Sequence, residues 1–359
     1  MEKAVLVGIK LKREKISLEE SLQELAQLTK TAGARVVAAI SQNRETPHQK
    51  YFIGEGKLEE LKVVCDSKDA DLIILDHDVS PSQLGNLEAV LERKVIDRTE
   101  LILDIFAQHA HTREGKLQVE LAQSQFRLSR LSGKGVQLSR LGGGIGTRGP
   151  GETKLETDRR HIWKRISLLK KEVDRIKMHR LVSRKKRSRS EIKSIALIGY
   201  TNSGKSTLLN ALSNARIPSE DKLFATLDPT TRRVYLPSGI TVLITDTVGF
   251  IQKLPHSLVN AFRATLEETT ESDLLIHVVD ASSRFYEDQI NTVYNVLEEL
   301  GMIARPIITV FNKLDRVENK KNIELSMRQY APATAISALQ KQGFEELFRL
   351  IEKQLSLPS

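Results

Sequence analysis

A short stretch just past the middle of the chain brings glycines, one lysine and several hydroxyl side chains together. It reads GYTNSGKST over residues 199–207 and follows the aliphatic run 195–198, which is typical of a buried strand. A strand, then G-x-x-x-x-G-K-S, then a helix is the pattern of a phosphate-binding loop. Backbone N–H groups would surround the phosphates, Lys205 would reach the β and γ oxygens, and Ser206 would ligate Mg²⁺. The residues expected in the loop are Gly199, Tyr200, Thr201, Asn202, Ser203, Gly204, Lys205, Ser206 and Thr207.

A carboxylate and a glycine follow the next apolar strand pattern. The stretch TVLITDTVGF ends its strand at Asp246 and has Gly249 three positions later, with Thr247 and Val248 between them. A carboxylate at a strand end can hold the Mg²⁺ shell, and a glycine amide can bond a γ-phosphate and be released when that phosphate leaves. We therefore expect Asp246 to be a metal ligand and Gly249, together with Lys205, to be catalytic.

A third motif selects the base. The strand PIITVFNKLD delivers Asn312, Lys313, Leu314 and Asp315, and the later stretch AISAL contains Ser337, Ala338 and Leu339. A carboxylate at 315 can accept hydrogen bonds from the N1–H and amino group of guanine, whereas adenine offers no such donor pair. A backbone N–H in the 337–339 loop could face guanine O6. The expected cofactors are therefore GTP or GDP with Mg²⁺, bound in a P-loop GTPase domain.

The residues before this domain predict two further units. Between residues 5 and 110, strand-like and helix-like patterns alternate, which indicates a small α/β domain with a largely parallel sheet. Two heptad-like leucine and isoleucine stripes then predict an antiparallel helical hairpin. We expect an α/β chain with the α/β domain at 1–112, the hairpin at 113–182, a basic linker at 183–193 and the GTPase domain, with a mostly parallel sheet, at 194–359.

The expected hairpin tip, residues 132–151, is rich in glycine and strongly cationic. It carries eight glycines, and no Asp or Glu occurs from 121 to 151. Free backbone N–H groups and arginine side chains suit an RNA backbone, in line with the net charge of +9. A linker that is basic without function stays open as the alternative. The candidate RNA contacts are Arg127, Arg130, Lys134, Arg140 and Arg148.

The chain resembles a known family. The stretches DKLFATLDPTTRRV, DTVGFIQKLPHSLVNAFRATLEE, DRTELILDIFAQHAHTREGKLQVELAQ and GGGIGTRGPGETKLETDRR are similar to the HflX family of ribosome-associated GTPases. The resemblance implies that the front domain and hairpin bind the large ribosomal subunit, and that members separate stalled or stress-damaged ribosomes. It also implies a first switch formed by Phe224, Ala225, Thr226, Leu227 and Asp228.

Two positions in the resemblance need comment. The resemblance implies that Thr226 is the catalytic threonine that ligates Mg²⁺, although Thr230 and Thr231 have the same chemistry. Phe250 stands where many GTPases place a glutamine that orients the attacking water, and a phenyl ring cannot do this. The family shares this hydrophobic substitution, so we expect slow hydrolysis until a partner accelerates it.

Composition narrows the remaining alternatives. The single cysteine excludes an internal disulfide and a multi-cysteine zinc site, and no signal peptide or membrane-spanning run is apparent. We expect a cytoplasmic monomer, with a peripheral place at a membrane left open. Alternative functions are a GTP-regulated adaptor for a protein or a membrane surface, and an RNA-remodelling factor.

Overall fold

The computed structural model describes residues 1–12, 17–139, 150–187, 192–213, 223–253, 272–302 and 305–356. At 132–139, 150–155, 179–187 and 320 it describes the backbone alone. The described chain divides into two compact units, Met1–Arg175 and the residues from Ile176 onward.

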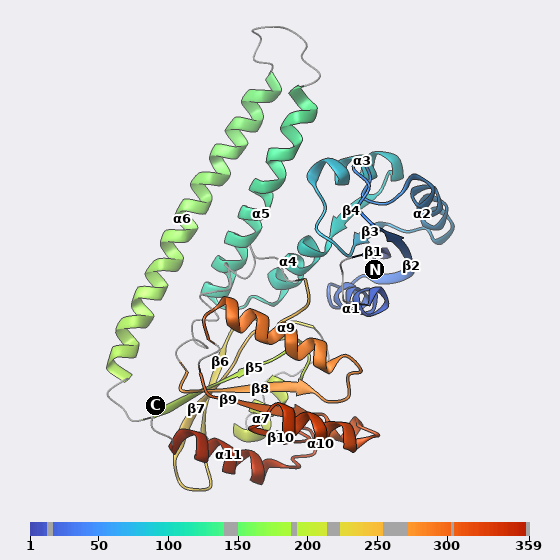
Figure 1. The fold of residues 1–359 in the computed structure, drawn as a ribbon. Coiled ribbons are helices and arrows are strands. Elements are labelled where there is room, and N and C mark those ends of the chain that lie inside the picture. Colours follow the sequence, from blue (N-terminus) through green and yellow to red (C-terminus); the bar gives the residue numbers. More distant parts are fainter. Residues whose placement is uncertain are drawn as a thin grey trace. The chain divides into compact units, whose positions relative to one another are not determined.

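The first unit begins with a four-stranded parallel sheet of order β2-β1-β3-β4 (Figure 1). Helices α2 and α3 pack on one face through buried leucines, and α1 and α4 cover the other face. The predicted small α/β domain is therefore confirmed. Its elements are β1 (Lys3–Leu11), α1 (Leu18–Thr31), β2 (Arg35–Arg44), α2 (Glu55–Lys68), β3 (Leu72–Leu75), α3 (Pro81–Leu91), β4 (Lys94–Asp97) and α4 (Arg98–His109).

Two long helices follow, α5 (Arg113–Ser139) and α6 (Pro150–Arg187), and they lie side by side (Figure 1). Their seam contains Leu121, Ile166 and Leu169, with Leu117 and Leu128 packed against it. The leucine and isoleucine stripes thus pair as expected.

The helices extend further than the sequence analysis expects. α5 continues to Ser139 through Gly133 and Gly135, and α6 begins at Pro150, so the described parts of the expected tip 132–151 are helical. α6 also runs to Arg187, five residues into the expected linker 183–193. Isolated glycines lower helix propensity by only about 1 kcal/mol each, and Lys and Arg are good helix formers, so these residues continue the helix.

The second unit is built on a six-stranded sheet of order β10-β9-β8-β5-β7-β6. All neighbouring strands are parallel except the edge strand β6, which is antiparallel to β7. Apolar residues of α7 and α11 pack on one face, and those of α9 and α10 pack on the other. The elements are β5 (Lys193–Ile198), α7 (Lys205–Ser213), β6 (Thr230–Tyr235), β7 (Thr241–Asp246), β8 (Leu274–Asp280), α9 (Tyr286–Glu299), β9 (Ile307–Asn312), α10 (Lys320–Gln329), β10 (Ala333–Ala335) and α11 (Phe344–Ser356).

This sheet positions the predicted motifs. Parallel strands end at one edge, and β5, β7, β8 and β9 end there at Ile198, Asp246, Asp280 and Asn312. Within the described residues, no helix has the length and apolar content to cross a membrane.

Candidate functional site

The loop between β5 and α7 requires its two outer glycines. Gly199 has a φ of +148°, and a Cβ there would lie 2.2 Å from the carbonyl oxygen of Val278 on β8. Gly204 has a φ of +93°, and its Cβ would lie 2.3 Å from Nδ2 of Asn312 on β9. A side chain at either position would collide with the sheet edge, so only glycine lets the loop backbone pack directly against it. The N-terminus of α7, with its free backbone N–H groups, lies at this loop.

Lys205 lies at the centre of this loop. Its Nζ donates hydrogen bonds to the carbonyl oxygens of Gly199, at 3.2 Å, and Tyr200, at 2.8 Å. Burial lowers the pKa of Lys205 to about 8, although the nearby Asp246 carboxylate acts in the opposite direction. The ammonium is thus held among neutral carbonyls, where a phosphate oxygen would be a stronger hydrogen-bond partner.

Three oxygen-bearing side chains meet beside this lysine. Ser206 Oγ donates to Asp246 Oδ2 at 2.6 Å and lies 2.8 Å from Thr226 Oγ1. Asp246 is fully buried, and its Oδ1 has no hydrogen-bond partner among the described residues. Burial raises the pKa of Asp246, while Lys205 and Ser206 lower it. A buried carboxylate oxygen without a partner, next to two hydroxyls, suits a hard divalent cation such as Mg²⁺.

The geometry also separates the three candidate threonines. Thr226 lies next to Ser206, whereas the Thr231 hydroxyl is 2.9 Å from Thr245 Oγ1 across the β6–β7 pair. Thr230 belongs to β6, where its register partner is Asp246. Of the three, Thr226 makes the described side-chain contact with the serine of the phosphate loop.

The segment after β7 is joined to the phosphate loop by hydrogen bonds. Thr201 N–H donates to the Phe250 carbonyl at 2.7 Å, and Phe250 N–H donates to the Gly199 carbonyl at 3.1 Å. Gln252 N–H donates to Tyr200 Oη at 2.8 Å. Gly249 directly precedes Phe250, and a Cβ on Gly249 would lie only 2.6 Å from Thr201 Cα. Gly249 is therefore held directly against the loop.

The Phe250 side chain turns away from this pocket. It is 2% exposed and belongs to an apolar cluster that includes Ala196, Ile198 and Leu275. The ring thus anchors the segment in the core of the unit and offers no group to a water molecule at the pocket.

One pocket is lined by many of the predicted phosphate-loop and first-switch residues, although Gly199, Tyr200, Ser203 and Asp228 are not among its lining residues. Phe224, which has a φ of +57°, donates its N–H to Thr201 Oγ1 at 2.9 Å and so attaches the first-switch segment to the loop. Leu227 and Val248 are buried beside the pocket without lining it. The lining residues are Thr201, Asn202, Gly204, Lys205, Ser206, Thr207, Phe224, Ala225, Thr226, Thr247 and Gly249.

The base-selecting motif is tied to the same loop. Asn312 Nδ2 donates to the Ser203 carbonyl at 3.0 Å, and Asn312 Oδ1 accepts from the Ala338 N–H at 3.0 Å. Ser337 Oγ donates to Asp315 Oδ1 at 2.5 Å. The Ala338 N–H is one candidate donor to guanine O6 in the 337–339 loop, and in this structure it donates to Asn312 instead. Leu339, next to it, is largely exposed.

The sequence motifs do not include one further charged residue of this region. Asp280, at the end of β8, forms a 2.7 Å ion pair with Lys313 Nζ and so orients the lysine of the motif. The available signal is its place at the end of a buried strand, since β8 ends at the same sheet edge as β7 and β9.

The expected RNA contacts are only partly described. Arg127 is exposed on α5, whereas Arg130 Nη2 is 2.5 Å from Asp97 Oδ2 and its side chain is 19% exposed. The guanidinium of Arg130 is thus engaged within the protein, and a contact of Arg130 with RNA stays a prediction. The side chains of Lys134, Arg140 and Arg148 lie outside the described part of the chain.

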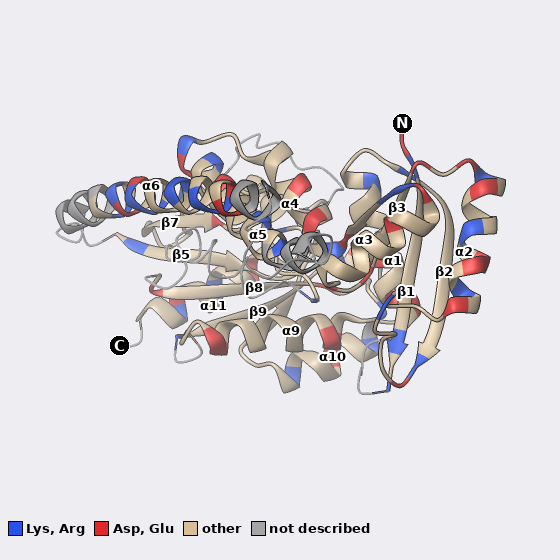
Figure 2. Ribbon diagram, turned by 90° about the horizontal axis from the view of Figure 1, so that it is seen from above, with Lys and Arg blue, Asp and Glu red and all other residues tan. Residues whose placement is uncertain are grey.

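A second cationic surface appears that the sequence analysis does not single out. Lys and Arg recur along α6 (Figure 2), and those whose side chains are described are exposed. The exposed cations of the first unit on α6 are Arg159, Arg160, Lys164, Arg165, Lys170, Lys171 and Arg175.

The strand, loop and helix geometry, with the base-selecting motif at the neighbouring strand end, defines a P-loop GTPase. Comparisons with known proteins specify it further. Family models match over residues 19–107 (GTP-binding GTPase N-terminal), 109–187 (GTP-binding GTPase Middle Region) and 194–313 (50S ribosome-binding GTPase). The chain belongs to the HflX family of GTPases.

The relatives cover nearly the whole chain. It is 50% identical over 359 residues to GTPase HflX of Caldanaerobacter subterraneus subsp. tengcongensis, which covers 99% of this chain and 81% of that protein. It is 44% identical over 356 residues to GTPase HflX of Escherichia coli, covering 99% and 83%. The crystal structure of SsGBP with GDP aligns with a TM-score of 0.55 and 27% identity over 99% of this chain and 100% of that one. A GTP-binding protein of Sulfolobus solfataricus in complex with GDP aligns with a TM-score of 0.50 and 26% identity, covering 99% and 98%.

Proposed function

We propose that this GTPase binds the rRNA of the large ribosomal subunit through its hairpin, and that its GTP cycle times the separation of stalled or stress-damaged ribosomes into subunits. The observation that carries the proposal is the solvent-facing row of cations on α6, in a chain whose third family match is a 50S ribosome-binding GTPase. Phosphate contacts by Lys and Arg supply most of the affinity of proteins for nucleic acid.

The nucleotide chemistry follows from the pocket. Backbone N–H groups of 202–207 and the Lys205 ammonium would hold the phosphates. Asp315 would accept hydrogen bonds from the guanine base and select GTP over ATP. Ser206, Thr226 and Asp246 would hold Mg²⁺, which when bound neutralises charge on the β- and γ-phosphates.

Hydrolysis depends on a partner in this proposal. Phe250 lies in the core and offers no hydrogen bond to an attacking water. Gly249, at the edge of the pocket, would bond the γ-phosphate through its amide and lose that bond when the phosphate leaves. A partner that orders the water or adds positive charge can contribute about 10³ to 10⁵ in rate, so GTP turnover should rise when the ribosomal subunit is bound.

The test uses a cation variant and a matched control. Lys164, Lys171 and Arg175 share one face of α6 and are exposed, so the triple glutamine variant removes three charges without touching the seam. The control replaces Lys321, Arg328 and Lys353, exposed cations of the GTPase unit, in the same way. GTP turnover is measured with increasing large subunits, and subunit binding is measured at several salt concentrations.

We expect wild type and control to be stimulated equally. The α6 variant should need far more subunits for the same stimulation, and its plot of log affinity against log salt should be shallower by about two to three. Separation of intact ribosomes by the GTP-bound protein is followed by sedimentation. Absence of stimulation in wild type, or equal affinity of the α6 variant, would reject the proposal.

A further inference from the structure

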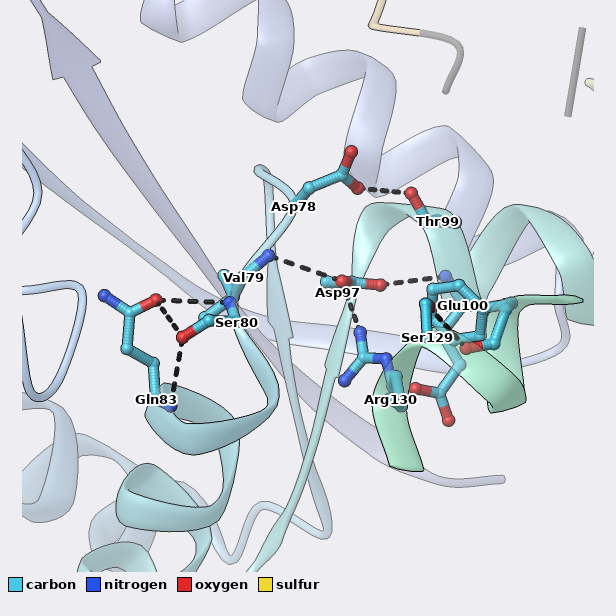
Figure 3. A network of polar contacts seen from close by, with 10 residues as sticks. Asp78, Val79, Ser80, Gln83, Asp97, Thr99, Glu100, Ser129 and Arg130 are labelled. Atoms are coloured by element: carbon cyan, nitrogen blue, oxygen red, sulfur yellow. Dashed lines mark hydrogen bonds and ion pairs between the residues drawn. The ribbon is translucent and has the colours of Figure 1, made fainter. Parts of the chain in front are cut away.

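A buried carboxylate joins several elements of the α/β domain (Figure 3). Asp97, at the end of β4, is 1% exposed, and its Oδ1 accepts the Glu100 N–H at 2.9 Å as the N-cap of α4. Its Oδ2 accepts the N–H of Val79, in the loop after β3, at 3.4 Å. The start of α4 and the loop before α3 are therefore tied to one side chain.

A residue of the hairpin completes this group. Arg130 on α5 places Nη2 2.5 Å from Asp97 Oδ2, and its guanidinium lies 4.4 Å from the centre of the Phe126 ring, one turn earlier on the same helix. Stacking on the ring and pairing with the carboxylate restrict the guanidinium to one direction. By contrast, the 2.5 Å pair of Arg165 with Glu120 joins α6 to α5 within the hairpin.

We propose that the Arg130–Asp97 pair is a positioning latch that sets the direction in which the hairpin projects from the α/β domain. α5 also packs against α3 and α4, but apolar packing is not directional, whereas a buried ion pair can fix one register. α5 is roughly 40 Å long, so a rotation of about 10° would move one end relative to the other by roughly 7 Å. The latch would therefore decide where the helices present their cations.

Two substitutions separate a latch from a direct RNA contact. Arg130→Met removes the charge, whereas Asp97→Asn keeps an N-cap acceptor but weakens the pair and leaves the guanidinium in place. Asp97→Asn also loses the weak 3.4 Å bond from the Val79 N–H, but all three variants, the double variant included, lose the Arg130–Asp97 pair, so a latch predicts the same change of hairpin direction in each. A direct contact predicts a defect in Arg130→Met alone. Arg165→Met, which breaks the pair within the hairpin, is the matched control.

The first measurement is the distance between two spin labels in the first unit. Cysteines replace exposed Lys62 on α2 and Arg160 on α6, in a Cys65→Ala background that removes the buried native thiol. Wild type and Arg165→Met should give one narrow distance distribution, whereas Arg130→Met and Asp97→Asn should broaden it or shift it by several Å. An unchanged distribution in both latch variants would overturn the inference.

The second measurement rests on the proposed function, and it uses GTP turnover with and without large subunits. Both latch variants should keep wild-type turnover without subunits, because the nucleotide site lies in the second unit, and should need roughly tenfold more subunits for half-maximal stimulation. Urea unfolding checks that their first unit folds. A normal response of Asp97→Asn beside a defective Arg130→Met would overturn the latch in favour of a direct contact. If wild type itself is not stimulated, the proposed function fails, and the label distances still decide the latch.

Discussion

The two sheets end in similar carboxylates that have opposite surroundings. In the first unit, Asp76 follows β3 and is fully buried, and it accepts hydrogen bonds from Arg98 Nη1 at 2.8 Å and Ser21 Oγ at 2.6 Å. Arg98 also pairs with Glu24. Charge at this edge is matched by other side chains of the same unit.

At the edge of the second sheet, the buried charged groups are incompletely paired within the protein, so they can bind a ligand. Asp246 is equally buried, but its Oδ1 has no partner among the described residues, and the neighbouring Lys205 is bonded to carbonyl oxygens of its own loop. Both sheets are of the parallel type whose strand ends commonly bind ligands. The difference indicates that a ligand site is marked by uncompensated buried groups as well as by the fold.

The largest expected effect is that of Asp246→Asn. Loss of the carboxylate should lower GTP turnover about 10³-fold at saturating Mg²⁺, because the proposed Mg²⁺ site loses its one negatively charged ligand. Stability without nucleotide should be unchanged or higher, because burial raises the pKa of Asp246 and so disfavours its charged form in the folded protein. Turnover and urea unfolding are measured on the same preparations.

A control carboxylate at the opposite edge of the same sheet gives the opposite pattern. Asp273 accepts the Ser194 N–H at 2.8 Å and lies near Lys193, so Asp273→Asn should cost some stability and leave turnover within about twofold. A loss of stability in Asp246→Asn as large as in Asp273→Asn would remove the contrast between matched and unmatched carboxylates.

Next in size is Arg98→Met in the first unit. The substitution would leave the buried carboxylate of Asp76 without its cation, which should lower the free energy of unfolding by about 3 kcal/mol or more. Lys12→Met, which breaks an exposed pair with Glu45, should cost less than about 1 kcal/mol. Urea unfolding of the full chain measures both. Similar values for the two variants would show that the first sheet edge is not held by its matched charges.

Local chemistry was predictable from the sequence, and long-range partners were not. The residues of the phosphate loop are contiguous, so their spacing alone indicates what they can bind. Asp97 and Arg130 are separated by 33 positions, and nothing in either neighbourhood indicates that they pair. From sequence alone, Arg130 therefore appears only as one cation of a basic segment.

Other differences have equally physical reasons. The core position of Phe250 follows from the parallel continuation of β5 and β7, which sequence patterns do not specify at the level of single side chains. The alternation of strand and helix patterns sufficed for the architecture, because burial of one face imposes that period on the sequence. The expected tip and linker are partly helical, at 132–139 and 183–187, because helix propensity there is only weakly opposed by single glycines and is favoured by Lys and Arg.

A smaller effect concerns a buried histidine on β8. His277 is 1% exposed, packs edge-on against Tyr294 at 5.6 Å, and has no partner for Nδ1 among the described residues. Burial, together with the nearby Lys205 charge, lowers the pKa of His277 to about 3. Between its ordinary value of 6.5 and this value the unfolded chain binds the extra proton, so stability falls as pH falls.

Protonation of His277 in the unfolded chain should therefore lower the free energy of unfolding by about 2 kcal/mol as the pH falls from 6.5 to 5. The difference in unfolding free energy between wild type and His277→Leu, which cannot titrate, should change by this amount over that range. The comparison is made by urea unfolding at each pH. A pH-independent difference would mean that His277 can also be protonated in the folded protein. Its side chain would then have a hydrogen-bond acceptor at this part of the second sheet.

The smallest expected effect tests how the pocket is held together. Tyr200→Phe removes only the hydroxyl that accepts the Gln252 N–H, and a single hydrogen bond of this kind contributes about 1 kcal/mol. If the bond positions Gly249 against the loop, kcat should fall about three- to tenfold with little change in KM, since the base-selecting and phosphate contacts remain. Tyr286→Phe, which removes a hydroxyl 2.9 Å from Ser326 in the same unit, should lower stability by a similar amount and leave kcat unchanged. Equal kcat values for the two variants would mean that the backbone bonds of Phe250 suffice to hold the segment.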